Sequence, residues 1–220
     1  MFETIANAAE FVRAADRDRW LATLYAPEPV RAACLAAHAL DLELAKLVAT
    51  TTEPMIGRIR LAWWRERLMG LDRSEVSAQP VLQALVRDVL TRGVTGARLA
   101  VFEDAWLDVL AGLPDAAALA RHVAARGAAV FGTLATLLGG DLAAAEALGA
   151  SWAAGEAARA GWGVVDVSLP PRAPPALRSL AGLAALGRRD VARAVAGQAV
   201  EPRATAARQW LLLRAATFGR

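Results

Sequence analysis

The sequence consists largely of long segments rich in alanine and leucine, separated by prolines, glycines and helix-capping residues, and this pattern constrains the fold most strongly. Alanine makes up about a quarter of the 220 residues, whereas residues that favour β-strands are sparse. Alanine and leucine are strong helix formers. The sequence therefore predicts an all-α protein, with an orthogonal or bundle-like arrangement of consecutive helices.

Capping and breaking residues set the boundaries of the predicted helices. Asp115 and Asp141 are placed to accept hydrogen bonds from the first turns of two helices, and Thr52 is expected to do the same before Pro54. Gly187 is a candidate break in a later helix. The predicted helices span residues 3–15, 16–24, 29–49, 53–71, 76–92, 95–110, 115–138, 141–161, 176–196 and 203–218.

One segment, residues 162–175, is rich in proline and is predicted to be the long loop of the chain. The residues that follow it are too few to bury a core of their own. We therefore expect a single domain over residues 1–220.

Several protein classes are excluded by simple features of the chain. No stretch of about 18 apolar residues lacks a charge, so no transmembrane helix is predicted. Cys34 is the single cysteine and is expected to be a small buried hydrophobic residue. The N-terminal sequence Met-Phe-Glu lacks the basic residues and apolar segment of a leader, which predicts a location in the cytoplasm.

The basic residues are almost all arginines, because Lys46 is the one lysine among 25 basic residues. The arginines alternate with acids, as in residues 16–19, and form no dense basic run. Nucleic acid is therefore not an expected partner. The helices are also not strongly basic on one face, so peripheral contact with a membrane is left open but is expected to be weak.

Standard catalytic motifs are absent from the sequence: there is no phosphate-binding glycine loop, zinc-binding pattern or nucleophile elbow. The two histidines, His38 and His122, lie on different predicted helices. We interpret them as buried or helix-face residues rather than metal ligands, and no metal site is predicted.

Three segments in a fixed order are more informative: Asp16–Arg31, Ala39–Ala45 and Glu53–Arg65, the last ending in Trp-Trp-Arg. This set resembles the squalene/phytoene synthase family. The second and third segments look most like the branch that contains the mitochondrial respiratory complex I assembly factor and its bacterial relatives. The likeness continues loosely through residues 130–132 to the Leu169-Pro170 loop.

The resemblance implies the all-α isoprenoid-synthase fold and, in active members, the head-to-head joining of two prenyl diphosphates. That reaction uses Mg²⁺ held by two aspartate-rich motifs on facing helices, since the metal prefers several converging oxygen ligands. In this sequence the first motif falls on residues 45–49, where Ala45 and Ala49 replace aspartates. The second maps to Ala160 and Val164. Both motifs are lost, and no cofactor is predicted.

Three acids remain near the lost motifs: Asp41, Glu156 and Asp166. A divergent Mg²⁺-dependent enzyme would use them, but one acid per helix makes a poor metal cage. The favoured alternative is that Asp41 and Glu156 pair with basic neighbours such as Arg159 on a solvated face.

The residues expected to line a central cavity, on the strength of the resemblance, are His38, Asp41, Ala45, Ala49, Trp64, Glu156 and Ala160. Adjacent residues point in different directions on a helix, so of Trp63 and Trp64 one is expected in the core. Arg31, Arg58 and Arg60 are candidates to bind an anion, because guanidinium groups suit diphosphate. Ordinary amphipathic patterning also explains the arginines of residues 58–67.

These observations leave three functions. The first, which the resemblance suggests, is a non-catalytic family member that binds an apolar small molecule or a protein partner and acts in complex I assembly at the inner face of the membrane. The second is an active transferase that joins prenyl diphosphates. The third is a module that binds an apolar ligand or a membrane surface and has no role in respiration. A fold does not by itself determine a function. The preference for the first function therefore rests on the replaced aspartates.

Overall fold

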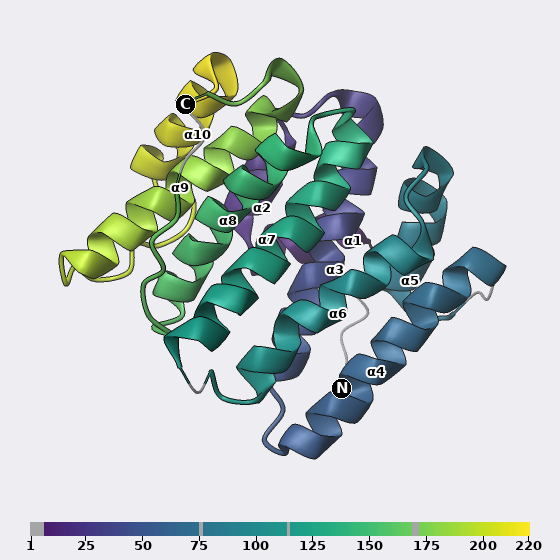
Figure 1. Ribbon diagram of the computed structural model, residues 1–220. Coiled ribbons are helices and arrows are strands. Elements are labelled where there is room, and N and C mark those ends of the chain that lie inside the picture. The colour runs from purple at the N-terminus through teal and green to yellow at the C-terminus, as the bar shows by residue number, and fades with distance from the viewer. Residues whose placement is uncertain (1–6, 75–76, 114, 169–171) are drawn as a thin grey trace.

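The structure, a computed structural model, describes residues 7–74, 77–113, 115–168 and 172–220, and these contain helices and no strand (Figure 1). The all-α prediction is confirmed. The α-helices are α1 (Ala8–Ala15), α2 (Arg17–Thr23), α3 (Arg31–Ala49), α4 (Pro54–Gly70), α5 (Pro80–Ala84), α6 (Gly96–Leu110), α7 (Ala116–Leu138), α8 (Leu142–Arg159), α9 (Arg178–Val195) and α10 (Ala206–Phe218).

Most helix boundaries agree with the capping residues. Asp115 and Asp141 cap α7 and α8, where their carboxylates accept hydrogen bonds from backbone amides of the first turn. The expectation for Thr52 is wrong: the N-cap of α4 is Glu53, which makes no capping bond with its side chain, and proline occupies the first turn. Residues 3–6, 75–76 and 169–171 of the predicted elements lie outside the described residues.

The segment after α5 differs from the predicted continuous helix. The α-helix ends at Ala84, a π-helical turn follows over Leu85–Val89, and a 3₁₀ turn over Leu90–Arg92 leads to Gly93. Gly93 adopts a positive φ of 80°, a conformation that glycine tolerates best. The chain can therefore turn sharply into α6.

Six helices form a row in which each contacts the next, in the order α4, α6, α7, α8, α9 and α10. Figure 1 shows this row running from α4 at one edge to α10 at the other. Helices α2 and α3 pack against the row, α3 on α6 and α7 and α2 on α9 and α10, and α1 packs on α2 and α3. The interior thus lies between α2, α3, α7 and α8.

Glycine pairs allow the middle of the row to pack closely. A Cβ atom on Gly155 would lie 2.2 Å from the Cα of Gly187, and one on Gly127 would lie 2.5 Å from the backbone of Gly149. Gly187 therefore does not break α9, which continues to Val195. Its role is to let the backbones of α8 and α9 approach each other.

The region between α8 and α9 contains the proline-rich connection. Its described residues carry no α-helix before Arg178, as expected for a segment with four prolines between residues 170 and 175. Among the described residues, no helix combines the length and the apolar character needed to cross a bilayer.

Candidate functional site

The interior between α2, α3, α7 and α8 contains charged side chains, which we call the central cluster: Asp16, Arg19, Asp41, Arg126, Glu156 and Arg203. Arg19 and Asp41 are each only 1% exposed. Charges at this depth persist only when they are paired, because removing an ion from water is costly.

Asp41 lies at the centre of this cluster and both of its oxygens accept bonds from arginines. Arg126 donates from Nε to Oδ1 at 3.0 Å and from Nη2 to Oδ2 at 2.8 Å, while Arg19 Nη1 donates to Oδ2 at 2.8 Å. Burial alone would raise the pKa of Asp41, but the two guanidinium charges outweigh it and lower the pKa to about 2. Asp41 is therefore ionised at neutral pH.

Glu156 on α8 is also bound by arginines. Arg203, in the loop before α10, donates from Nη2 to both carboxylate oxygens at 3.0 and 2.8 Å, and Arg19 Nη2 lies 3.5 Å from Oε2. Burial alone would raise the pKa of Glu156. The positive charges of Arg203 and Arg19 outweigh burial, so the pKa of Glu156 falls below its usual range. Arg203 also pairs with Asp16 at 3.0 Å and connects the C-terminal loop to α2.

Aromatic rings fill the space around the guanidinium groups. The guanidinium carbons of Arg19 and Arg126 lie 4.7 and 4.9 Å from the centroid of the Trp152 ring. Arg126 also lies 4.5 Å from the centroid of Trp106, and Phe131 stacks on Trp152. Cation–π contacts of this kind stabilise desolvated arginines. The region where the family resemblance predicts a metal-binding cavity is thus occupied by arginine and tryptophan side chains.

The described residues do not fit the Mg²⁺ ions that active squalene/phytoene synthases use. No three His, Cys, Asp or Glu side chains converge within the described part of the chain. Asp41 and Glu156 direct their oxygens to guanidinium groups, which repel a cation. The expectation that both acids form pairs holds, but their placement on a solvated face was wrong, since Asp41 is buried and its partners come from other helices.

A second group of ion pairs continues this network to α10. The buried Arg208 donates to Asp18 on α2 at 2.8 Å and to both oxygens of Asp190 on α9 at 2.7 and 3.0 Å. Arg159, the predicted partner of Glu156, pairs instead with Asp190 at 3.3 Å. These contacts fix α10 to the rest of the fold.

Sequence reasoning missed Arg19, Arg126, Arg203 and Arg208. The available signal was the interruption of apolar runs by single charges, as at Arg126 between alanines and glycine in α7. A charge at a position that faces the core requires a partner, but the sequence does not reveal which residue supplies it.

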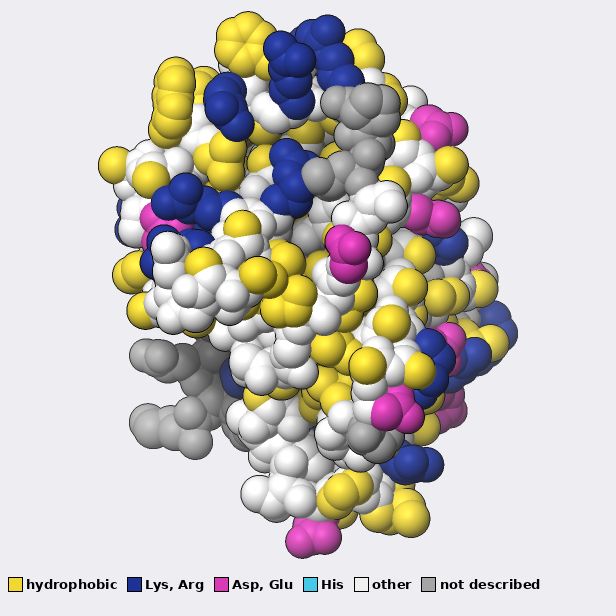
Figure 2. Space-filling view, turned by 60° about the vertical axis from the view of Figure 1, so that its left-hand side comes forward, with side chains coloured by type: hydrophobic (Ala, Val, Ile, Leu, Met, Phe, Trp, Pro, Cys, Tyr) yellow, Lys and Arg dark blue, Asp and Glu magenta, His cyan; other side chains and the backbone are white. Residues whose placement is uncertain are grey.

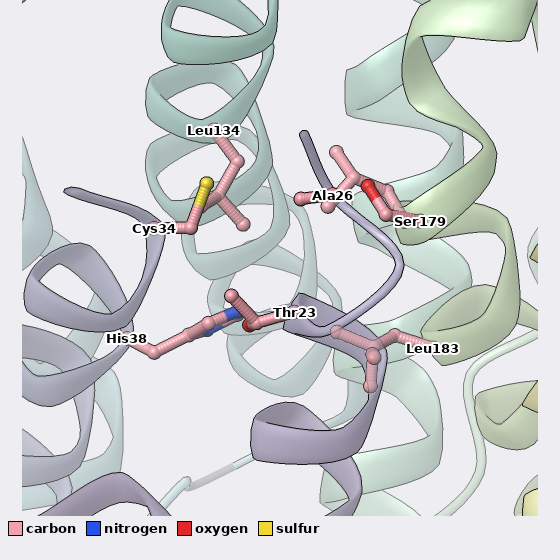
Figure 3. Close-up of a pocket in the computed structure, with 9 residues that line it drawn as sticks. Thr23, Ala26, Cys34, His38, Leu134, Ser179 and Leu183 are labelled. Atoms are coloured by element: carbon pink, nitrogen blue, oxygen red, sulfur yellow. The ribbon is translucent and has the colours of Figure 1, made fainter. Parts of the chain in front are cut away.

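His38 borders a small cavity together with Thr23, Cys34 and Ser179, and none of the other predicted cavity residues lines it (Figure 3). The volume of this cavity is only about 10 Å³, which is room for about one water molecule. Figure 3 shows the His38 ring pointing from α3 toward Thr23 of α2. Burial, followed by the charge of Arg19, lowers the pKa of His38 to about 3. The histidine is neutral at physiological pH.

The four remaining predicted cavity residues belong neither to the central cluster nor to the lining of the His38 cavity. Ala45 packs half-buried against the core, and Ala49 and Ala160 are exposed at the ends of α3 and α8. Trp64 is buried in the hydrophobic core, whereas Trp63 beside it is 40% exposed. The expectation that one of the two tryptophans lies in the core is confirmed.

The predicted anion-binding arginines are also dispersed. Arg31 donates to the backbone oxygen of Ala26, and Arg60 donates to Thr51 on the surface. Arg58 is exposed on α4, and Asp166 is exposed in the loop after α8. The structure therefore brings Asp41 and Glu156 together through Arg19 and leaves the candidate anion-binding residues separate.

Comparison with known proteins supplies the family. A sequence model of the family described as squalene/phytoene synthase matches residues 12–157, which is more than half of the chain. The chain belongs to the squalene/phytoene synthase family. No curated protein and no solved structure gives a match. The squalene/phytoene synthase match ends within α8, so α9, α10 and the arginines Arg203 and Arg208 lie beyond it.

Proposed function

We propose that this squalene/phytoene synthase family member is not an enzyme and acts by binding a protein partner. One observation carries the proposal: the two carboxylates that remain near the lost aspartate motifs, Asp41 and Glu156, are neutralised by Arg19, Arg126 and Arg203. Ionisation of a prenyl diphosphate needs divalent cations held by several oxygens. Here, positive groups of the protein occupy those oxygens.

The interior also supports a protein partner over an apolar small molecule. The cavity at His38 holds about one water molecule and is far smaller than the several hundred Å³ of a ligand pocket. The neighbouring space is filled by Trp152, Trp106 and the cluster arginines. An apolar ligand bound here would have to displace buried ion pairs.

The resemblance of Ala39–Ala45 and Glu53–Arg65 to the complex I assembly branch supports a more specific role. In this proposal the protein assists respiratory complex assembly in the cytoplasm, at the inner face of the membrane. Its partner would be a subunit or another assembly protein, and recognition would use the surface of the helical domain.

The catalytic alternative is tested directly. The purified protein is incubated with farnesyl or geranylgeranyl diphosphate and Mg²⁺, and pyrophosphate release is measured, with an active squalene synthase as the positive control. We expect no release above the protein-free background. Turnover that is lost in Glu156→Gln, in a protein whose circular dichroism is unchanged, would overturn the proposal.

Metal binding gives a readout that is independent of turnover. Mn²⁺ added to the protein is followed by electron paramagnetic resonance, in which bound and free ions differ. We expect no saturable binding at micromolar concentration with or without a diphosphate. A stoichiometric Mn²⁺ site that disappears in Asp41→Asn would contradict the interpretation that arginines occupy the carboxylate oxygens of Asp41 and Glu156.

The assembly role requires a cellular test. Deletion of the gene should lower NADH:quinone oxidoreductase activity in membranes and leave succinate dehydrogenase activity unchanged. Complementation with the wild-type gene should restore the activity, and so should a Glu156→Gln gene whose product folds. Normal complex I activity after deletion would exclude this role while leaving the non-catalytic assignment intact.

A further inference from the structure

The surface of α9 and α10 carries arginines that have no acidic partner. Residues 172–189 and 206–220 contain four and three arginines respectively, and neither segment contains an aspartate or glutamate. Arg208 and Arg189 are paired with Asp190 and Glu201. The five that remain make no ion pair with any described residue, and we call them the basic face: Arg172, Arg178, Arg188, Arg214 and Arg220.

Tertiary contacts bring these arginines together from distant parts of the chain. The site of a Cβ on Gly182 of α9 lies 2.8 Å from the side chain of Leu212, so the two helices pack closely. Arg172 donates to the backbone oxygen of Phe218 at 2.9 Å, which places the end of the proline-rich loop at the end of α10. The segments before α9 and at the end of α10 therefore share one face.

Two of the arginines are held in an unfavourable environment. Burial lowers the pKa of Arg188, and the nearby charge of Arg214 lowers it further. The Nε atom of Arg178 is buried and has no hydrogen-bond partner in the described residues. Guanidinium groups that lack a counter-charge in the folded protein are suited to an external anion.

Large apolar side chains lie among these charges. Trp210, Leu213 and Phe218 of α10 are 62%, 44% and 54% exposed. Positions 210 and 213 are three residues apart and share the outward face of the helix. Figure 2 shows this side of the molecule, with dark-blue and yellow side chains intermixed in the upper part and magenta ones lower and to the sides.

We propose that the basic face docks onto an anionic membrane surface, with Trp210, Leu213 and Phe218 at the level of the lipid headgroups and the arginines on the phosphates. Tryptophan is enriched at this depth of a bilayer, and arginines near the surface are attracted by anionic lipids. Peripheral docking of this kind needs no transmembrane helix. It also does not depend on whether the central cluster is catalytic.

Other occupants fit this surface less well. A second copy of the chain would place the same arginines opposite one another, and like charges oppose association. A stable protein interface buries about 800 Å² on each partner and uses more than 20 residues. The apolar centre of the basic face consists of three exposed side chains of one helix, which is small for such an interface. A lipid surface requires no shape complementarity and provides the missing negative charge.

Vesicle flotation tests the proposal on the full chain. Wild-type protein should float with vesicles of phosphatidylcholine containing 30% phosphatidylglycerol and remain unbound with pure phosphatidylcholine; high salt should release it. Each arginine near an anionic surface contributes about a fivefold increase in partitioning. We therefore expect Arg188→Ala/Arg214→Ala to bind roughly 25-fold more weakly and Trp210→Ser/Phe218→Ser to lose binding as well.

The matched control is α4, at the opposite edge of the row (Figure 1). This helix exposes Ile59 to 63%, with the exposed Arg58 beside it, so it offers the same residue types on a different face. Arg58→Ala/Ile59→Ser should leave flotation unchanged. Circular dichroism and melting curves should show that all three double variants fold.

Three outcomes would overturn the proposal: no flotation with anionic vesicles, equal flotation with neutral vesicles, or loss of binding in the α4 variant but not in the α10 variants. Tight binding of a mixed-sequence single-stranded oligonucleotide, abolished by Arg188→Ala/Arg214→Ala while vesicles are not bound, would assign the face to nucleic acid instead. Complex I activity in cells has no bearing on these outcomes.

Discussion

Arginines occupy two opposite environments in this protein. In the central cluster, Arg19 and Arg126 are almost fully buried and bond to Asp41. On the basic face, Arg188 and Arg214 lie near each other, and neither makes an ion pair with a described residue. The same side chain thus stabilises the interior in one region and leaves a surface charged in the other.

The comparison of buried, paired arginines with unpaired arginines at the surface indicates where a guanidinium charge affects the stability of the fold. A buried ion pair contributes little net stability when compared with apolar residues, yet removing one partner is strongly destabilising because the other charge stays buried. A charge in contact with water is screened and has almost no such effect. The central arginines should therefore affect folding, and the arginines of the basic face should affect binding.

The largest expected effect is at Asp41. Asp41→Ala removes the counter-charge of two buried guanidiniums and should lower the free energy of unfolding by about 3–5 kcal/mol, measured by urea denaturation. Asp108→Ala is the control, because Asp108 pairs with the exposed Arg121 and should cost less than about 1 kcal/mol. Similar losses for the two variants would remove the contrast between buried and exposed pairs.

A fall in pH favours protonation of the two buried histidines, His38 and His122, and so tests the cost of a buried charge without a mutation. The pKa of His38 is lowered to about 3 and that of His122 to about 4, in each case first by burial and then by a nearby arginine. Below pH 6.5 the unfolded chain binds protons that the folded chain does not, so stability falls as pH falls.

For the two histidines together, the loss between pH 6.5 and pH 5 should reach about 3 kcal/mol. His38→Gln should halve this slope in urea titrations. Asp41 titrates lower: its stabilising charge is present above about pH 4 and is lost as pH falls toward its folded pKa of about 2. A flat profile between pH 6.5 and pH 5 would show that the histidines are not desolvated.

Arg203 is intermediate between the two environments: its side chain is 26% exposed, yet it pairs with the carboxylates of Glu156 and Asp16. Arg203→Ala should lower the free energy of unfolding by about 2 kcal/mol and speed amide exchange in α10. Arg193→Ala is matched to it, since Arg193 lies in the same region and, among the described residues, its side chain bonds to the backbone oxygen of Ala199 and to no carboxylate. An equal effect in both variants would argue against a special role for the central cluster.

The smallest expected effect is on the basic face. Arg188→Ala and Arg214→Ala should each change the free energy of unfolding by less than about 0.5 kcal/mol. The loss of repulsion between the two like charges favours a slight stabilisation. Differential scanning calorimetry measures this directly. A loss above 2 kcal/mol would mean that these arginines are structural and have partners in the fold.

Much of the fold could be predicted from local chemistry. Asp115 and Asp141 marked the starts of α7 and α8, and the prolines after residue 169 marked the long break before α9. Thr52 was misinterpreted because α4 begins one residue later than expected, and Gly187 because its role depends on another helix. The cap of α4 is set by the backbone of Glu53, and Gly187 faces the backbone of α8.

The candidate site was only partly predictable. That Ala45, Ala49 and Ala160 stand where the family resemblance places metal-binding aspartates is a prediction made from the sequence alone. The partners of Asp41 could not be found in this way, because Arg126 lies 85 residues further along the chain. The expected solvated pairing assumed near neighbours, whereas tertiary packing supplied distant ones.

The sequence by itself determined the helical class and most helix boundaries, since these depend on residue type and short-range spacing. Tertiary structure decided which charges are neutralised and which face outward. Burial and distance set the free energy of a charge, and both depend on contacts between residues as far apart in the sequence as Asp16 and Arg203 or Arg172 and Phe218.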